Sequence, residues 1–194
     1  MLGRSCAFLL IPLIALGCAS ESSPPASSMQ IWVHQQGGIV QDARQARVDA
    51  AARPLLAHCQ GRTVTIQVFA MDQLCAYGWP SGNIFISRGL VDHLTNQELS
   101  ATVAHELGHL LSDGRLQSTV SLRGYPSSYD REVRADAAGI GLLQASGIPP
   151  HAMVTMLRKV ADSVDLPQVK LAIDHRIAIL NSEIKSTDPV VYQR

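Results

Sequence analysis

The sequence carries no excess charge of either sign, since 16 Lys and Arg residues balance 16 Asp and Glu residues. Such a chain has no electrostatic footprint for nucleic acid and no polybasic attraction to anionic lipid. It also lacks internal repeats. Its 194 residues, 46% of them hydrophobic, are enough to bury one core. We therefore expect a single domain without a nucleic-acid partner, whose function must be sought in local motifs.

A hydrophobic run long enough to cross a bilayer is missing near the N terminus. The apolar stretch Ala7 to Leu16 is short, and Pro12 interrupts it. It follows the single charge of Arg4 and ends at Gly17-Cys18, an order typical of a secretory signal. We expect residues 1–17 to be a signal peptide that directs export and is then cleaved.

The end of this segment, Ala15-Leu16-Gly17-Cys18, resembles a bacterial lipobox, although such motifs usually carry a larger aliphatic residue in place of Ala15. The resemblance implies that Cys18 is lipidated and becomes the first mature residue; secretion without a lipid is the alternative. Ala19 is not the aspartate of an inner-membrane retention signal, which favours an outer-membrane anchor facing the periplasm. Residues 18–28, which include SESSPPASS, are then expected to form a disordered tether.

Cysteines are few, and two of the four, Cys6 and Cys18, belong to the exported leader region. Cys59 and Cys75 remain in the domain, which would fold in an oxidising compartment. A disulfide between them is the natural hypothesis. Two buried thiols are the alternative, because the separation that decides between them is not contained in a sequence.

Residues 29–194 read as an α+β domain that is mainly helical, with a small sheet. Alternation of apolar and polar residues predicts the strands, and apolar spacing of three and four predicts the helices. Residues 116–128 read as a mobile loop. The expected strands span 63–69 and 82–87, and the expected helices span 39–58 (bent or ended near Pro54), 95–112, 130–145, 151–163 and 168–184.

One of these helices contains the motif H-E-x-x-H, formed by His105, Glu106 and His109. Residues four apart lie on the same helix face, so the two imidazoles can aim at one point. Zinc held by neutral imidazoles lowers the pKa of water and polarises a carbonyl, and Glu106 can serve as the general base. The alternative is an ordinary helix with two surface histidines, which chance supplies in roughly a few chains per thousand.

Zinc requires a third protein ligand. Ser112 and Arg115 stand where a metzincin would carry Gly and His, which excludes that class. Glu132 and Asp136 are again four apart, so one carboxylate can bind the metal while the other orients a histidine.

Two alternatives stay open for the carboxylates. Asp113 is a competing ligand, although its place before a glycine favours a helix-ending role. Glu132 and Asp136 could instead belong to a solvated helix face, ion-paired with Arg131 and Arg134.

Taken together, the stretches 81–90, 96–109 and 132–136 resemble the gluzincin family of zinc metallopeptidases that includes HtpX and the CAAX prenyl endopeptidases. The resemblance covers residues 39–184 and implies a zincin-like fold with one Zn²⁺ ion. It implies His105, His109 and Glu132 as zinc ligands, Glu106 as catalytic base and Asp136 as an orienting carboxylate. It also implies that Gly82, Asn83 and Ile84 form an edge strand, flanking the motif helix, against which a peptide substrate lies.

The sequence departs from the family pattern in two places. Cys75-Ala76 stands where the family usually has Asn-Ala, which puts the substrate contact there in doubt. Leu166-Pro167 lacks the histidine of the family's His-Pro, although Arg176-Ile177 fits the Arg-Ile that follows. His175 or Arg176 could replace the missing histidine as a substrate or oxyanion contact, and a plain surface role for His175 is equally compatible with the sequence.

These motifs predict a lipid-anchored zinc endopeptidase of the bacterial cell envelope that hydrolyses unfolded or misassembled proteins. The first alternative is a non-catalytic zinc-binding lipoprotein that acts as an adaptor in envelope assembly. The second is a latent enzyme, in which the loop at 116–128 or Cys75 blocks the metal.

Overall fold

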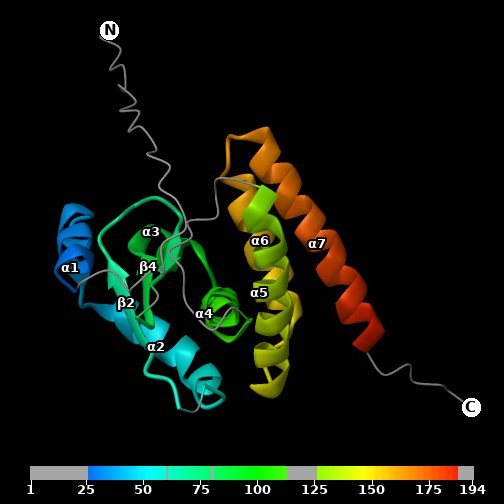
Figure 1. The fold of residues 1–194 in the computed structure, drawn as a ribbon, viewed down its shortest axis with the longest axis horizontal. Coiled ribbons are helices and arrows are strands. Elements are labelled where there is room, and N and C mark those ends of the chain that lie inside the picture. Colours follow the sequence, from blue (N-terminus) through cyan, green and yellow to red (C-terminus); the bar gives the residue numbers. More distant parts are fainter. Residues whose placement is uncertain (1–25, 60, 80, 113–125, 188–194) are drawn as a thin grey trace, which may run out of the picture.

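Helices and one small sheet make up the described part of this computed structural model, residues 26–59, 61–79, 81–112 and 126–187 (Figure 1). This arrangement confirms the expected α+β, mainly helical class. The helices are α1 (Ala26–Gln35), α2 (Ala43–Leu56), α3 (Arg88–His93), α4 (Asn96–Ser112), α5 (Pro126–Ala145), α6 (His151–Asp162) and α7 (Pro167–Thr187), and the strands are β1 (Ile39–Val40), β2 (Thr65–Phe69), β3 (Ala76–Gly78) and β4 (Asn83–Ser87).

Several expectations fall wholly or partly outside these ranges: the signal peptide, the lipidation site Cys18, Asp113 and most of the loop at 116–128. Within the ranges, no helix is both long enough and apolar enough to span a membrane.

The four strands have the order β1-β2-β4-β3. Strand β4 runs parallel to β2, with Ile84 opposite Ile66, and antiparallel to β3, with Phe85 opposite Tyr77. The expected edge strand at Gly82, Asn83 and Ile84 is therefore wrong, because β4 has a partner on both sides. Strand β3, which lies outside both expected strands, is an edge strand of the sheet, and it contacts α4.

A tight turn produces this hairpin. Gly82 donates its amide hydrogen to the oxygen of Trp79, and Trp79 donates to the oxygen of Asn83. Gly82 has φ +88°, and a Cβ there would collide with the oxygen of Thr63. Only glycine suits this position, so Gly82 ends the turn and β4 begins at the next residue.

Each face of the sheet is covered by helices. Ile66, Val68, Ile84 and Ile86 belong to the large core shared with α2 and α4. The opposite face packs Phe69 and Phe85 into an aromatic cluster under α1. There Trp32 of α1 lies 5.5 Å from Phe69 and 4.9 Å from Trp79, measured between ring centroids. Helix α1 begins at Ala26, so the last three residues of the expected tether are helical.

The expected disulfide between Cys59 and Cys75 is also wrong. Both thiols are free and buried. Cys59 lies in the large core, where its Sγ is 3.7 Å from the oxygen of Leu55. Cys75 lies in the aromatic cluster, with its Sγ 3.4 Å from Met71 Sδ. Because the two thiols occupy different clusters and contact different partners, they are not positioned for the short Cβ separation that a disulfide requires.

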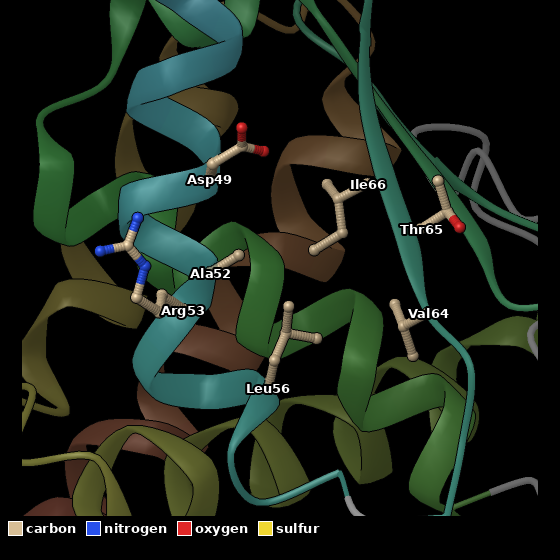
Figure 2. A pocket seen from close by; sticks show the side chains of 7 residues that line it. All are labelled: Asp49, Ala52, Arg53, Leu56, Val64, Thr65 and Ile66. Carbon is tan, nitrogen blue, oxygen red and sulfur yellow. The ribbon is translucent and has the colours of Figure 1, made fainter.

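A pocket of about 410 Å³ lies between α2 and β2 (Figure 2). Strand β1 pairs with Val68 and Phe69 of β2 and does not extend to the pocket residues Thr65 and Ile66. The side chain of Gln45 then bonds the oxygen of Ile66 and the amide of Val68, in place of a strand. None of the residues expected to bind metal lines this pocket.

Helix α4 is held at both ends. At its start, Glu98 Oε2 accepts from the amide of Thr95, and Thr95 Oγ1 accepts from the amide of Glu98, which is a capping box. Lys159 of α6 lies 2.7 Å from the same carboxylate. Near its end, Arg62 donates to the oxygen of Leu110. These contacts fix the helix that carries the H-E-x-x-H motif.

Candidate metal centre

Two glycines let helices α4 and α5 pack backbone against backbone. A Cβ on Gly108 would lie 2.9 Å from the carbonyl carbon of Ala135 and closer still to its oxygen. On the facing helix, a Cβ on Gly139 would lie 3.0 Å from the oxygen of Ala104. Side chains at these positions would force the helices apart, because close-packed interiors leave no room. The close approach places Glu132, about one turn before Ala135, against the histidines of α4.

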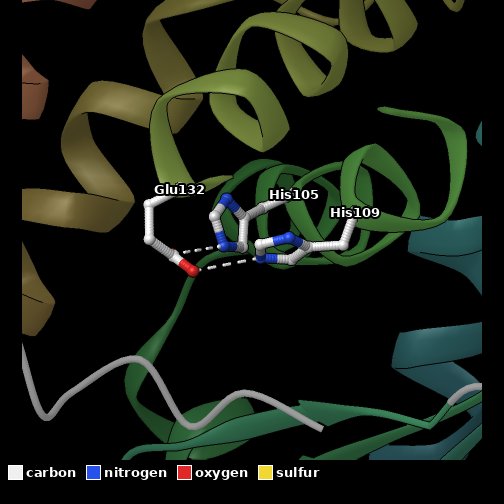
Figure 3. Close-up of side chains that lie close together, drawn as sticks. All are labelled: His105, His109 and Glu132. Carbon is white, nitrogen blue, oxygen red and sulfur yellow. Dashed lines mark ion pairs between the residues drawn. The ribbon is translucent and has the colours of Figure 1, made fainter. Parts of the chain in front are cut away.

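The three expected metal ligands lie together at this contact. Glu132 faces both imidazoles of α4 (Figure 3), with Oε2 3.2 Å from His105 Nε2 and Oε1 3.3 Å from His109 Nε2. One ligand atom from each residue lies within 4.8 Å of the others. Two imidazole nitrogens and a carboxylate oxygen thus share one small space.

The chemistry of these donors fits a metal ion. Two histidines and one glutamate form a donor set that catalytic zinc sites use, with one position left for water or substrate. Glu132 Oε1 is buried and, apart from its 3.3 Å contact with His109 Nε2, has no hydrogen-bond partner among the described residues. A buried carboxylate oxygen in that condition is costly, and a bound cation would satisfy it. The site could therefore bind a metal.

Asp136 orients the first histidine. Its Oδ1 lies 2.8 Å from His105 Nδ1, on the ring side opposite Glu132. A proton on Nδ1 then leaves the Nε2 lone pair directed at the shared space. Of the two histidines that Asp136 could have oriented, the structure selects His105. Because Glu132 and Asp136 are both buried, the alternative of a solvated, ion-paired helix face is wrong.

Arg176 was expected as a substrate or oxyanion contact but lies behind the site. It is buried, and its Nε and Nη2 donate to the two oxygens of Asp136 at 2.7 Å each. Its Nη1 lies 3.2 Å from Glu132 Oε2. With its guanidinium occupied by two carboxylates, Arg176 is not free to contact substrate.

His175 pairs with Tyr129. It is exposed, and its Nδ1 pairs with the hydroxyl of Tyr129 while the two rings stack at 10°. Sequence reasoning overlooked Tyr129. The available signal was spacing, since Tyr129, Glu132 and Asp136 follow one face of α5.

Burial and charge together shift the pKa values of these groups. Burial opposes the charged form of His105, yet its hydrogen bonds to Asp136 and Glu132 raise the pKa to about 10. The pKa of Glu132 is lowered well below the usual range, because the histidines outweigh the effect of burial. The pKa of Asp136 is also lowered, since Arg176 outweighs burial. In the metal-free protein the contacts of His105 with Glu132 and Asp136 are therefore charged pairs.

Glu106 has a different environment. Its carboxyl is buried on α4, and this burial raises its pKa above the ordinary value, against the opposing effect of His105 and His109. A carboxylate with a raised pKa accepts a proton more readily than a solvated one, which is a property of general bases.

Comparisons with known proteins agree with this geometry. Residues 40–124 match Peptidase family M48. The chain is 24% identical over 161 residues to the Metalloprotease LoiP of Escherichia coli (strain K12), a similarity that covers 66% of this chain and 64% of LoiP. The matched part of LoiP is thus less than two thirds of its length.

The family match includes the H-E-x-x-H motif and ends before α5, so it does not include Glu132, Asp136 or Arg176, which the structure brings to the site. Members of this family are metal-dependent peptidases. The cluster of His105, His109 and Glu132, which could hold a metal ion, agrees with that property. The motifs that resembled gluzincins, the matched segment and the related metalloprotease agree, and together they support a gluzincin metallopeptidase of family M48.

Proposed function

We propose that this protein is a zinc-dependent endopeptidase that cleaves unfolded or misassembled polypeptides in the bacterial cell envelope. The observation that carries the proposal is the convergence of His105, His109 and Glu132 on one space, next to the buried carboxyl of Glu106. A structural zinc site has no use for a base in this position.

In this proposal His105, His109 and Glu132 hold one Zn²⁺ ion. When bound, the ion supplies a Lewis acid that polarises the scissile carbonyl and lowers the pKa of water. Asp136 keeps the proton of His105 on Nδ1, so that Nε2 is free to donate its lone pair.

Glu106 moves the protons. Its carboxylate takes a proton from the attacking water, and the same group then gives that proton to the leaving amine when the peptide bond breaks. The raised pKa of Glu106 suits both steps, because it is basic enough to accept the proton and acidic enough to return it.

Strand β3 is the edge along which we place the substrate, replacing the earlier expectation at β4. Cys75 and Trp79 bond their main-chain groups to β4, so those of Ala76 and Gly78, at alternate positions, point to the open edge. A peptide added there as a strand would be held by main-chain hydrogen bonds, which do not depend on its sequence. This recognition suits unfolded polypeptides of varied sequence.

The N-terminal motif supports a lipid anchor. We propose that residues 1–17 are cleaved and that Cys18 carries the lipid, which would hold the enzyme at the outer membrane, facing the periplasm. Labelling cells with a radioactive fatty acid tests this step: the wild-type protein should take up label and Cys18→Ser should not. Label in the Cys18→Ser variant would refute the assignment.

The decisive experiment compares wild type with Glu106→Gln, measuring zinc content and digestion of a reduced, alkylated protein. We expect both proteins to bind one zinc ion and only the wild type to cleave. Equal cleavage by a zinc-loaded Glu106→Gln protein would refute the role of Glu106. If zinc-loaded wild type cleaves nothing, the alternative of a non-catalytic or latent zinc-binding lipoprotein, acting as an adaptor in envelope assembly, takes its place.

A further inference from the structure

The buried guanidinium of Arg176 lies among three buried carboxylates at this site. The exposed fractions are 5% for Glu106, 4% for Glu132, 2% for Asp136 and 6% for Arg176. Buried charges are costly unless they are paired and hydrogen-bonded. Arg176 must therefore contribute something that the metal ligands themselves do not.

The contact between Arg176 and Asp136 is of a kind that fixes orientation. Nε donates to Oδ2 and Nη2 donates to Oδ1, both at 2.7 Å. Two parallel hydrogen bonds from a planar guanidinium hold a carboxylate in one plane, which a single bond from an ammonium group does not do.

The fixed orientation of Asp136 also fixes its hydrogen bond to His105. With both oxygens held by Arg176, Oδ1 still accepts from His105 Nδ1 at 2.8 Å. The third guanidinium nitrogen, Nη1, lies 3.2 Å from Glu132 Oε2. Arg176 thus touches the carboxylate that orients one proposed ligand and also touches a second ligand directly.

We propose that Arg176 is a positioning residue of the metal centre: through Asp136 it sets the ring orientation of His105, and it holds Glu132 by direct contact. Arg176 lies on α7, whereas Asp136 and Glu132 lie on α5 and His105 on α4. The C-terminal helix is therefore part of the metal centre, although it supplies no ligand. The proposal rests on the proposed metal site but not on the proposed peptidase activity.

Metal affinity is the direct test, measured by competition with a chromogenic chelator for Zn²⁺ and by the visible spectrum of the Co²⁺ form. Partners that orient metal ligands typically contribute about 10–100-fold in affinity. We expect a loss in that range for Arg176→Lys, which keeps the charge but not the planar fork, and a larger loss for Arg176→Met. Arg158→Met is the matched control, because Arg158 is exposed on α6 and has no partner among the described residues; its affinity should equal that of wild type.

Two further measurements separate positioning from a general contribution to folding. Adding millimolar guanidinium to Arg176→Gly should restore the Co²⁺ spectrum, whereas methylammonium at the same concentration should not. In Arg176→Met/Asp136→Asn the metal affinity should fall little below that of Asp136→Asn alone, because Arg176 acts mainly through Asp136. Metal affinities are compared only among variants that circular dichroism shows to be folded.

The proposal is overturned if folded Arg176→Lys binds zinc within twofold of wild type, or if the losses of the two single variants simply add. These measurements need no substrate. If zinc-loaded wild type cleaves nothing while the affinities follow the expected pattern, the proposed peptidase function fails and the role of Arg176 stands.

Discussion

Gly108 directly precedes His109 and has no side chain. We expect it to be as necessary to the metal centre as a ligand. A Cβ at this position would lie 2.9 Å from the carbonyl carbon of Ala135, whereas carbon atoms in contact are about 3.5 Å apart or more. Gly108→Ala therefore requires α4 and α5 to separate by at least about 0.6 Å, and by more where the oxygen of Ala135 is closer.

The expected loss of stability is moderate. Forcing a methyl group into a packed contact costs about 1–3 kcal/mol, while alanine in a helix is about 1 kcal/mol more favourable than glycine. The net loss should be about 0–2 kcal/mol, measured as the free energy of unfolding in urea.

The expected loss of metal affinity is larger. Glu132 lies on α5 and the two histidines lie on α4, so the separation of the helices enters the metal–ligand distances directly. Metal sites tolerate deviations of only about 0.2 Å in those distances. We expect Gly108→Ala to remain folded and to bind zinc at least about tenfold more weakly than wild type.

The matched control is Gly141→Ala, on α5. A Cβ on Gly141 meets nothing within 4 Å, so alanine there should stabilise the protein by about 0.5–1 kcal/mol and leave zinc affinity unchanged. If Gly108→Ala binds zinc as tightly as Gly141→Ala, the close approach of the two helices does not set the ligand geometry.

Three other predictions follow from buried groups. Glu98→Gln should lose about 1–2 kcal/mol near neutral pH, because the carboxylate caps α4 and pairs with Lys159. Burial alone would raise the pKa of Glu98, but its bonds to Lys159 and Thr95 lower it overall. The loss of stability in Glu98→Gln should therefore shrink as pH falls below about 4.3. A difference in urea midpoint that stays constant with pH would contradict this. Zinc affinity should rise with pH between about 6 and about 8, because the raised pKa of His105 means that binding must displace a proton; a flat profile in chelator competition would exclude that proton. Cys59 and Cys75 should each react with iodoacetamide after unfolding without reductant, and a protein two hydrogens lighter than the dithiol mass would restore the disulfide hypothesis.

The elements predicted best from the sequence are those with a local signal. The helix expected at 95–112 matches α4, and its start is a local signal because Thr95 and Glu98 form a capping box. The spacing of His105 and His109 placed both imidazoles on one helix face without any knowledge of the fold. Helices α6 and α7 were expected within a few residues of their ends because their apolar spacing is regular.

The sheet was predicted poorly because strand order depends on partners that are distant in the sequence. Strand β3 has three residues and ends in a glycine, so it has too few alternating positions to signal a strand. It exists because the turn at Gly82 folds it onto β4. The first three residues of α1 were read as part of a tether for a related reason: the helix starts with small polar residues, and its position depends on Trp32 packing against the aromatic cluster.

The metal centre combines both kinds of information. The H-E-x-x-H motif predicts two ligands and a base from spacing alone, but it does not determine the distance from α4 to the helix that supplies the third ligand. That distance depends on Gly108 and Gly139, which a search for ligands passes over because they have no side chain. Arg176 contributes in the same indirect way from a third helix, by holding the carboxylates that face His105. A chain that kept every proposed ligand but lost Gly108 or Arg176 would keep the motif and still bind metal weakly.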